Sequence, residues 1–181
     1  MALRARIALA VVSCVQISVA AESHVIHIHN FAAVNDHIYR GAEPSPLALE
    51  ELGALGVKLV IDLRENSGVT RAEQEHVRKL GMAYVNVPLN GFAAPTQAQM
   101  QSVLALLAHN DSQRIFVHCR RGKDRIGTVI ACYRIEHDGW NNKKALEEAR
   151  SHGMSSLQRA MQAYIAHFSP IALAPLVAAG N

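Results

Sequence analysis

The chain has 181 residues, of which 50% are hydrophobic and 18% are charged, and its formal net charge is +3. This length and composition suit one folded domain with its own core, and they exclude a fibrous or broadly disordered chain. The small net charge gives no basis for predicting a nucleic-acid partner.

The first 21 residues carry the features of an export signal in the required order. Arg4 and Arg6 precede an apolar stretch over residues 7–19, and small residues suited to cleavage follow it. The stretch is too short and too interrupted for a membrane-spanning helix, which needs ~20 apolar residues. We therefore expect a signal peptide over residues 1–21 and an exported chain, periplasmic or secreted, with no spanning segment after cleavage. Because two arginines and no acid would leave with the signal, the net charge would fall from +3 to +1.

The three cysteines make no disulfide framework. Cys14 would leave with the signal, and a lipid anchor there is the weaker alternative because apolar residues continue past it. Cys132 lies in an apolar run, which predicts a small core residue. A single disulfide between Cys132 and Cys119 stays open in an oxidising compartment.

From residue 46 onward, the apolar spacing alternates between helical and strand patterns. Thr70 with Glu73, and Thr96 with Gln99, predict capping boxes that open two of the helices. The expected helices span 47–55, 70–80, 96–108, 126–137, 141–152 and 156–168, and the expected strands span 57–63, 82–89 and 114–118.

Strands separated by helices predict one α/β domain, with a central mostly parallel sheet flanked by helices. We expect this domain over residues 22–168 and assign no element to residues 169–181. Sheets of this kind bind their ligands at the carboxyl ends of the strands. The loop that follows His118 lies at such an end.

The segment from His118 to Gly127 reads His-Cys-Arg-Arg-Gly-Lys-Asp-Arg-Ile-Gly. A strand enters this loop and a helix leaves it, so backbone amides can converge on an anion. The same field favours the thiolate of Cys119, and a thiolate is a nucleophile. Arg125 carries a planar fork that suits two phosphate oxygens. The loop is thus suited to attack of sulfur on phosphorus, which gives a phosphocysteine that water hydrolyses.

His-Cys-x-x-Gly-x-x-Arg between an apolar strand and an apolar helix resembles the signature loop of the protein tyrosine and dual-specificity phosphatase superfamily. Residues 38–44 and 55–64 are similar to the compact atypical dual-specificity phosphatases, so the resemblance covers roughly residues 30–138. It implies a fold like theirs and hydrolysis of a phosphate monoester, without metal or other cofactor. The implied substrate is a phosphotyrosine or other phosphoprotein, or a phosphoinositide.

The resemblance makes Cys119 the nucleophile and Arg125 the phosphate-binding arginine. His118 would help to orient the loop. The other residues expected around the phosphate are Arg120, Arg121, Gly122, Lys123, Ile126 and Gly127.

Two positions depart from the family pattern. A serine or threonine usually follows the arginine and supports departure of the thiolate, but Ile126 stands there, with Thr128 two residues on. The family usually also carries an aspartate general acid on a loop upstream of the cysteine, and residues 88–92 contain no acid.

The Lys-Asp-Arg end of the loop resembles a group of bacterial phosphatases that act on phosphotyrosine and phosphoinositides. That resemblance makes Asp124 the expected general acid. A structural partner of the nearby arginines, or a helix cap, is the alternative role for Asp124. Asp62 and Glu65, near the carboxyl end of their strand, are the remaining candidates.

Other charged groups point to less specific roles. Arg40 and Arg64 are expected to be buried or paired arginines. His24, His27 and His29 alternate as on one face of a strand, but no nearby Cys, Asp or Glu completes a ligand set, so we expect no metal. Gly122-Lys123 makes no ATP-binding loop, because an aspartate follows where serine or threonine is required.

Two other functions stay open. An inactive phosphate-binding module would explain Ile126 and the missing upstream acid. An arsenate reductase also uses Cys-x5-Arg, but it needs further cysteines, and only Cys132 is available.

Overall fold

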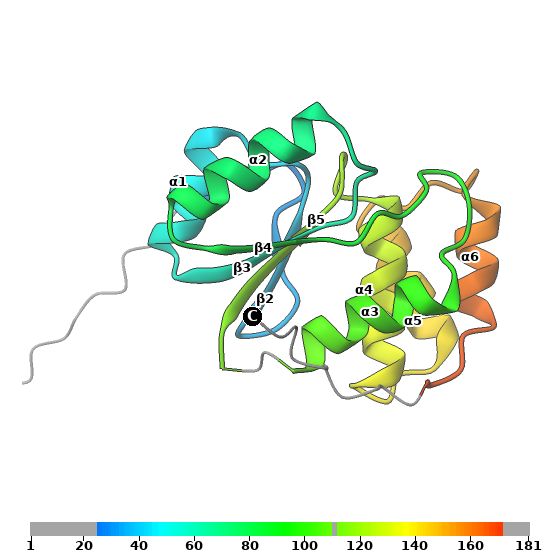
Figure 1. Ribbon diagram of the computed structural model, residues 1–181. Coiled ribbons are helices and arrows are strands. Elements are labelled where there is room, and N and C mark those ends of the chain that lie inside the picture. Colours follow the sequence, from blue (N-terminus) through cyan, green and yellow to red (C-terminus); the bar gives the residue numbers. More distant parts are fainter. Residues whose placement is uncertain (1–24, 110–111, 172–181) are drawn as a thin grey trace, which may run out of the picture.

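The computed structural model describes residues 25–109 and 112–171 (Figure 1). The predicted signal peptide, Cys14 and most of the unassigned C-terminal segment lie outside the described residues. Within the described part of the chain, no helix is long and apolar enough to cross a membrane.

Five strands form one sheet in the order β1-β2-β5-β3-β4. The pair β1–β2 is antiparallel, and the pairs β2–β5, β5–β3 and β3–β4 are parallel. The predicted central, mostly parallel sheet is therefore confirmed. The strands are β1 (Ala32–Ala33), β2 (Ile38–Gly41), β3 (Val57–Asp62), β4 (Ala83–Asn86) and β5 (Arg114–His118).

Helices cover both faces of the sheet. In Figure 1, α1 and α2 lie over one face, and α3, α4, α5 and α6 lie together on the other. The α/β class is confirmed. The helices are α1 (Pro46–Ala54), α2 (Gly68–Lys79), α3 (Gln97–Ala108), α4 (Asp124–Glu136), α5 (Asn142–Ser151) and α6 (Arg159–Ala166).

The alternation of side chains along β5 divides the core in two. Ile115 and Val117 face the α3–α6 layer and join its apolar cluster, whereas Phe116 packs in the cluster under α1 and α2. All three side chains are fully buried. Successive residues of a strand point to opposite faces of the sheet. His118 therefore lies on the same face as Phe116, toward α1 and α2, and Cys119 lies on the α4 side.

The start of α2 differs from the prediction. Ser67, not Thr70, caps the helix: its Oγ accepts the N–H of Thr70 at 3.2 Å, and the Oγ of Thr70 accepts the N–H of Ser67 at 2.9 Å. The capping box therefore lies one turn earlier than expected, and Glu73 takes no part in it. This leaves the side chain of Glu73 available for the interior.

Other element boundaries also differ from the predicted ones. The strand predicted over 82–89 is limited to β4, and α6 begins at Arg159 rather than at residue 156. Strand β2 was not predicted, because its four residues include a charged one. His27 lies in no strand; its ring pairs instead with Glu51 of α1, with Nδ1 and Oε1 2.5 Å apart.

Candidate active site

A cleft of about 1030 Å³ opens at the carboxyl ends of the parallel strands. Four segments that each follow a strand contribute to its wall: Glu43 follows β2, residues 64–67 follow β3, residues 90–92 follow β4, and the loop after β5 completes it. The loop brings five of the predicted site residues together there, namely Cys119, Arg120, Arg121, Asp124 and Arg125.

Cys119 lies where β5 meets the cleft. Its side chain joins the apolar cluster on the α4 side and only 2% of the residue is exposed, yet it contributes to the cleft wall. The thiol is thus accessible from the cleft alone. It is a free cysteine, as is Cys132, which is buried in α4. No disulfide joins the two, and burial raises the pKa of the Cys132 thiol well above its usual range.

Gly122 allows the loop to rest on the end of β2. Its φ is 67°, a conformation that side chains disfavour. A Cβ atom there would also lie 2.5 Å from the backbone nitrogen of Ala42 and 2.7 Å from the carbonyl carbon of Gly41. Glycine is therefore required twice, by the turn and by the close approach of the two backbones. The role of Gly122 is to shape the loop, and it presents no side chain to a substrate.

The N-terminus of α4 faces the cleft without a side-chain cap. The helices α1, α2, α3 and α5 each begin with a side chain that accepts a first-turn N–H, whereas Lys123 offers none to α4. Asp124 and Arg125, the first two residues of α4, line the cleft. First-turn amides without partners, at the positive end of the helix dipole, suit a bound anion.

Arg125 spans the cleft floor. Its Nη1 lies 3.5 Å from the carbonyl oxygens of Leu63 and Leu89, in the segments that follow β3 and β4. These are long contacts, which leave most of the hydrogen-bonding capacity of the guanidinium for another acceptor.

The two leading arginines lie at the cleft rim. Arg120 is exposed and forms no ion pair with any described residue. Arg121 exposes 66% of its side chain and approaches Asp124, with Nη2 and Oδ2 3.3 Å apart. Of these two arginines at the rim, Arg120 is therefore the one that is free to bind an anionic substrate.

Asp124 combines a place in the cleft wall with structural contacts. Its Oδ1 accepts the N–H of Ser155 at 2.8 Å, which ties the turn after α5 to the start of α4. Its Oδ2 faces Arg121, and only 6% of the residue is exposed. The contacts expected of a structural partner are thus present, in a carboxylate that also reaches the cleft.

Thr128 does not replace the hydroxyl that is missing at Ile126. Ile126 is fully buried in the core. The hydroxyl of Thr128 donates to the carbonyl of Asp124 at 2.9 Å, inside its own helix. Gly127 packs against α5: a Cβ atom there would lie 3.5 Å from that of Ala149. These three residues therefore shape α4 and do not line the cleft.

Lys123 turns away from the other loop cations. Its aliphatic stem passes the turn after α5, where a Cβ atom on Gly153 would lie 3.4 Å from its Cδ and Cε atoms. It does not line the cleft. The basic residues of the loop are thus divided between the cleft and the turn after α5.

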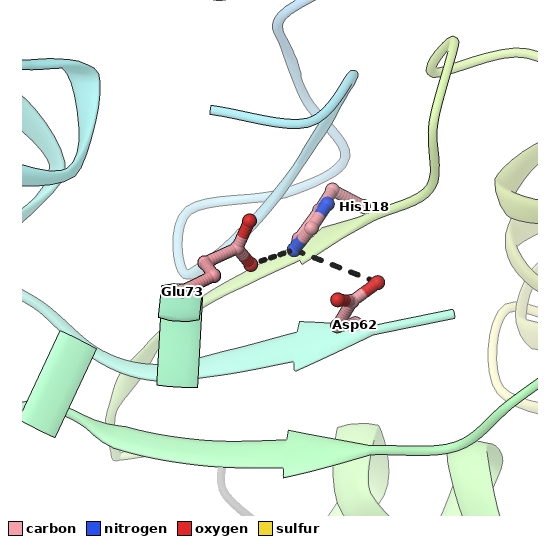
Figure 2. A group of neighbouring side chains, drawn as sticks. All are labelled: Asp62, Glu73 and His118. Carbon is pink, nitrogen blue, oxygen red and sulfur yellow. Dashed lines mark ion pairs between the residues drawn. The ribbon is translucent and has the colours of Figure 1, made fainter. Parts of the chain in front are cut away.

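His118 lies beneath the loop on the α1/α2 side, and Figure 2 shows its ring between two carboxylates. Its Nε2 is 2.9 Å from Oε1 of Glu73 and 3.9 Å from Oδ1 of Asp62. The ring stacks on Phe116, with centroids 5.3 Å apart. The ring of His118 is fully buried and does not line the cleft. Its contacts therefore anchor the backbone just before Cys119 in the protein interior.

Arg64 balances these carboxylates. It donates to Asp62 at 2.7 Å, to Glu73 at 2.6 Å and to Glu43 at 2.7 Å. Burial by itself would lower the pKa of Arg64, but hydrogen bonds and attraction from the carboxylates raise it, so the group stays charged. Arg64 is a buried, paired arginine, as the sequence predicted.

Asp62 is fully committed to this network. Burial would raise its pKa, but the hydrogen bonds from Arg64 and the attraction of His118 and Arg64 together outweigh burial, so the pKa lies below its usual range. Tyr84 also donates its hydroxyl to Asp62, at 2.7 Å, and burial followed by this bond raises the pKa of Tyr84. Asp62 does not line the cleft, whereas the other upstream candidate, Glu65, does.

The group Asp62, Glu73 and His118 has the donor set of a small cation site, with one ligand atom from each lying within 4.8 Å of the others. Arg64 already donates to both carboxylates. Its guanidinium supplies the positive charge that a metal would bring, so the residues fit an ion-pair network.

Sequence patterns missed two parts of the site. The sequence pattern predicts a capping box for Glu73, and its contact with His118 requires α2 to pack close to the end of β5. Phe92, 81% exposed, lines the cleft from the loop after β4. Gln158 fastens that loop, because its Nε2 donates to the carbonyl of Gly91 at 3.0 Å.

Known proteins are similar to this chain in sequence or fold. The dual specificity protein phosphatase TpbA of Pseudomonas aeruginosa is 27% identical over 124 residues, which cover 68% of this chain and 55% of that protein. The crystal structure of P. aeruginosa TpbA aligns with a TM-score of 0.65 at 26% identity, over 76% of this chain and 83% of that one. The core catalytic domain of the PP-IP phosphatase Siw14 from S. cerevisiae aligns with a TM-score of 0.71 at 24% identity, over 80% and 88% of the two chains.

The chain spans between 53% and 60% of the length of the first three curated relatives it matches. A family model described as "DSP-PTPase phosphatase fused to NAD+ Kinase" matches residues 13–167. With the strand–loop–helix arrangement around Cys119 and Arg125 in place, the chain belongs to this family of dual-specificity-type phosphatases.

Proposed function

We propose that the protein hydrolyses phosphate monoesters through a phosphocysteine intermediate at Cys119. The observation that carries the proposal is the uncapped N-terminus of α4 beside that thiol, at the base of the cleft. A phosphate seated there would meet the first-turn amides and the fork of Arg125. Its phosphorus would then face the sulfur.

The reaction proceeds in two steps. The sulfur of Cys119 attacks phosphorus, and the bond to the ester oxygen breaks with a proton supplied to the leaving oxygen. Asp124 is the proposed donor, since it is the acid of the loop and lies in the cleft wall. Water then attacks phosphorus and gives a proton to the carboxylate of Asp124, the P–S bond breaks, and the thiolate departs with the electron pair.

We further propose that the substrate is a phosphoprotein, with phosphotyrosine favoured. Arg64 and Arg121 are ion-paired, which leaves Arg120 and Arg125 as the cleft arginines without a carboxylate partner among the described residues. Two such cations suit one phosphate group better than the several of an inositol polyphosphate. Phe92 offers an aromatic surface for the ring of a phosphotyrosine.

The first test is hydrolysis of p-nitrophenyl phosphate by the full chain, reduced and with a chelator present. Cys119→Ser should abolish turnover, and Cys132→Ser should not. Activity that survives Cys119→Ser would overturn the proposal. Bound phosphate without turnover in the unchanged protein would favour a phosphate-binding module.

Substrate class follows from a panel of a phosphotyrosyl peptide, a phosphoseryl peptide and phosphoinositide vesicles. A higher kcat/KM for the phosphotyrosyl peptide is expected, and Phe92→Ala should lower that preference by raising KM. A preference for the vesicles would show that the substrate is a phosphoinositide and not a phosphoprotein.

Export is proposed from the sequence of residues 1–21 alone. Cell fractionation and N-terminal sequencing should find a chain that begins at Glu22 outside the cytoplasm of a bacterial host. An uncleaved chain in the cytoplasm would contradict export.

A further inference from the structure

Arg40 is a buried arginine for which the proposed chemistry has given no role. It lies in the middle of β2, in register with Val117 of β5, and only 1% of it is exposed. None of its three guanidinium nitrogens has a hydrogen-bond partner among the described residues. Long charged side chains are almost never fully buried without pairing, so the guanidinium calls for a countercharge.

The position of Arg40 points to the phosphate loop. The two residues that follow it, Gly41 and Ala42, form the surface on which Gly122 rests. Gly41 faces Phe116 and the α1/α2 side, so Arg40 points to the α4 side, as does Cys119. Arg40 is therefore on the inner side of the loop, opposite the cleft.

Four ionisable groups surround Arg40. Glu148 and Cys119 attract its charge when they are ionised, and Arg134 repels it. His152, in the turn after α5, has its pKa lowered by burial and then by the charge of Arg40. Both oxygens of Glu148 already accept hydrogen bonds from Arg134. Of the two groups that can carry a negative charge, Glu148 is thus already paired, and Cys119 is the one left for Arg40 to stabilise.

The guanidinium stays charged at neutral pH. Burial lowers the pKa of Arg40 to about 10, and Glu148 and Cys119 partly offset the effect of burial. A positive charge is thus held on the inner side of the loop throughout the reaction.

We propose that Arg40 is the internal countercharge of the Cys119 sulfur, a positioning residue that favours the thiolate both as nucleophile and as leaving group. In the second step the P–S bond breaks and negative charge develops on sulfur. The hydroxyl that supports this departure elsewhere in the superfamily is absent at Ile126, and the hydroxyl of Thr128 is engaged in its own helix. The charge of Arg40 takes over that task from behind the loop. The leaving-group part of this inference rests on the proposed function.

The first test measures the effect of the Arg40 charge on the reactivity of Cys119 without requiring turnover of a substrate. Alkylation of Cys119 by iodoacetamide, a neutral reagent, is followed by peptide mass spectrometry in the full chain across pH 5 to 9. Arg40→Met should slow alkylation at pH 6 by about tenfold, which corresponds to about 1.4 kcal/mol, and displace the profile to higher pH. Arg40→Lys, which keeps the charge, should stay within about twofold of the unchanged protein.

Two further variants guard the test. Arg150→Met removes an exposed arginine of α5 and should leave the profile unchanged. If Arg40→Met does not fold, Arg40→Gln replaces it, since it is polar and uncharged. Superimposable alkylation profiles with and without the charge at position 40 would overturn the proposal, whether or not the protein turns over substrate.

Kinetics then test the second step. With p-nitrophenyl phosphate in rapid mixing, Arg40→Met should slow breakdown of the phosphoenzyme more than its formation, so that the burst of nitrophenol grows relative to the steady rate. Equal slowing of both steps would show that Arg40 favours the thiolate as nucleophile but has no particular role in its departure. If the alkylation profile is displaced but no burst or turnover is seen, the role of Arg40 as countercharge would be supported, and the proposed function would be contradicted.

Discussion

Glu73 of α2 lies with Oε1 2.9 Å from Nε2 of His118, and His118 directly precedes Cys119 (Figure 2). The contact joins the α1/α2 layer to the strand that carries the proposed nucleophile. Through Arg64 the same carboxylate connects to Glu43 at the rim of the cleft. The floor of the cleft is therefore held by a buried charge network from the face of the sheet opposite α4.

Removing the charge of Glu73 should loosen this floor. Glu73→Gln leaves Arg64 with one buried partner fewer, and breaking a buried pair costs about 3 kcal/mol. We expect a loss of stability of that order and a several-fold lower kcat with p-nitrophenyl phosphate, because His118 would lose the charge of the nearer of its two carboxylates. Denaturant unfolding and steady-state kinetics measure the two effects. Glu75→Gln, the same change at an exposed position of α2, should alter neither; equal effects of the two variants would contradict the role of the network.

Asp124→Asn tests the general acid. The amide keeps an oxygen for the N–H of Ser155, so the turn after α5 should stay in place. If Asp124 protonates the leaving oxygen, the variant should lose about 100-fold in kcat with phenyl phosphate and much less with p-nitrophenyl phosphate, whose leaving group needs little protonation. The ratio of the two rates is the measurement. An unchanged ratio would assign Asp124 to the structural role alone and bring Glu65 forward as the candidate.

Ile126→Thr tests the missing hydroxyl. Ile126→Val is the matched control, because valine has nearly the shape of threonine without the oxygen. Both changes remove a buried methyl group and should cost about 1 kcal/mol or more of stability. Threonine alone should speed phosphoenzyme breakdown several-fold and shrink the nitrophenol burst. Identical bursts in the two variants would show that a hydroxyl here cannot reach the sulfur.

The sequence predicted the features that follow local rules. The alternation of helices and strands set the sheet class, and the strand–loop–helix pattern around Cys119 located the cleft. The position of Arg125 after a glycine-containing turn was likewise visible, because turn chemistry and helix starts are local properties.

What the sequence could not predict depends on packing between distant elements. Nothing in the order of residues brings Glu73 to His118, since that contact requires α2 to lie over the end of β5. The four residues of β2 are too few, and too polar at Arg40, to stand out as a strand. Whether the stem of Lys123 points to the cleft or to the α5–α6 turn is likewise decided by the space beside Gly153.

Asp62→Asn should make stability less dependent on pH in acid. In the folded protein the pKa of Asp62 is lowered, so its carboxylate contributes stability above the unfolded-state pKa of ~3.9, and this contribution is lost as the pH falls through the folded-state pKa. We expect the variant to be about 3 kcal/mol less stable at pH 7 and pH 5, with the difference shrinking below about pH 4. Urea unfolding at pH 7, 5 and 3.5 measures the difference. Asp138→Asn is the control, since its ion pair with Arg134 leaves 24% of the aspartate side chain exposed and should be worth about 1 kcal/mol or less. Equal losses in the two variants, or a difference that grows in acid, would show that the buried network around Arg64 does not stabilise the fold through the charge of Asp62.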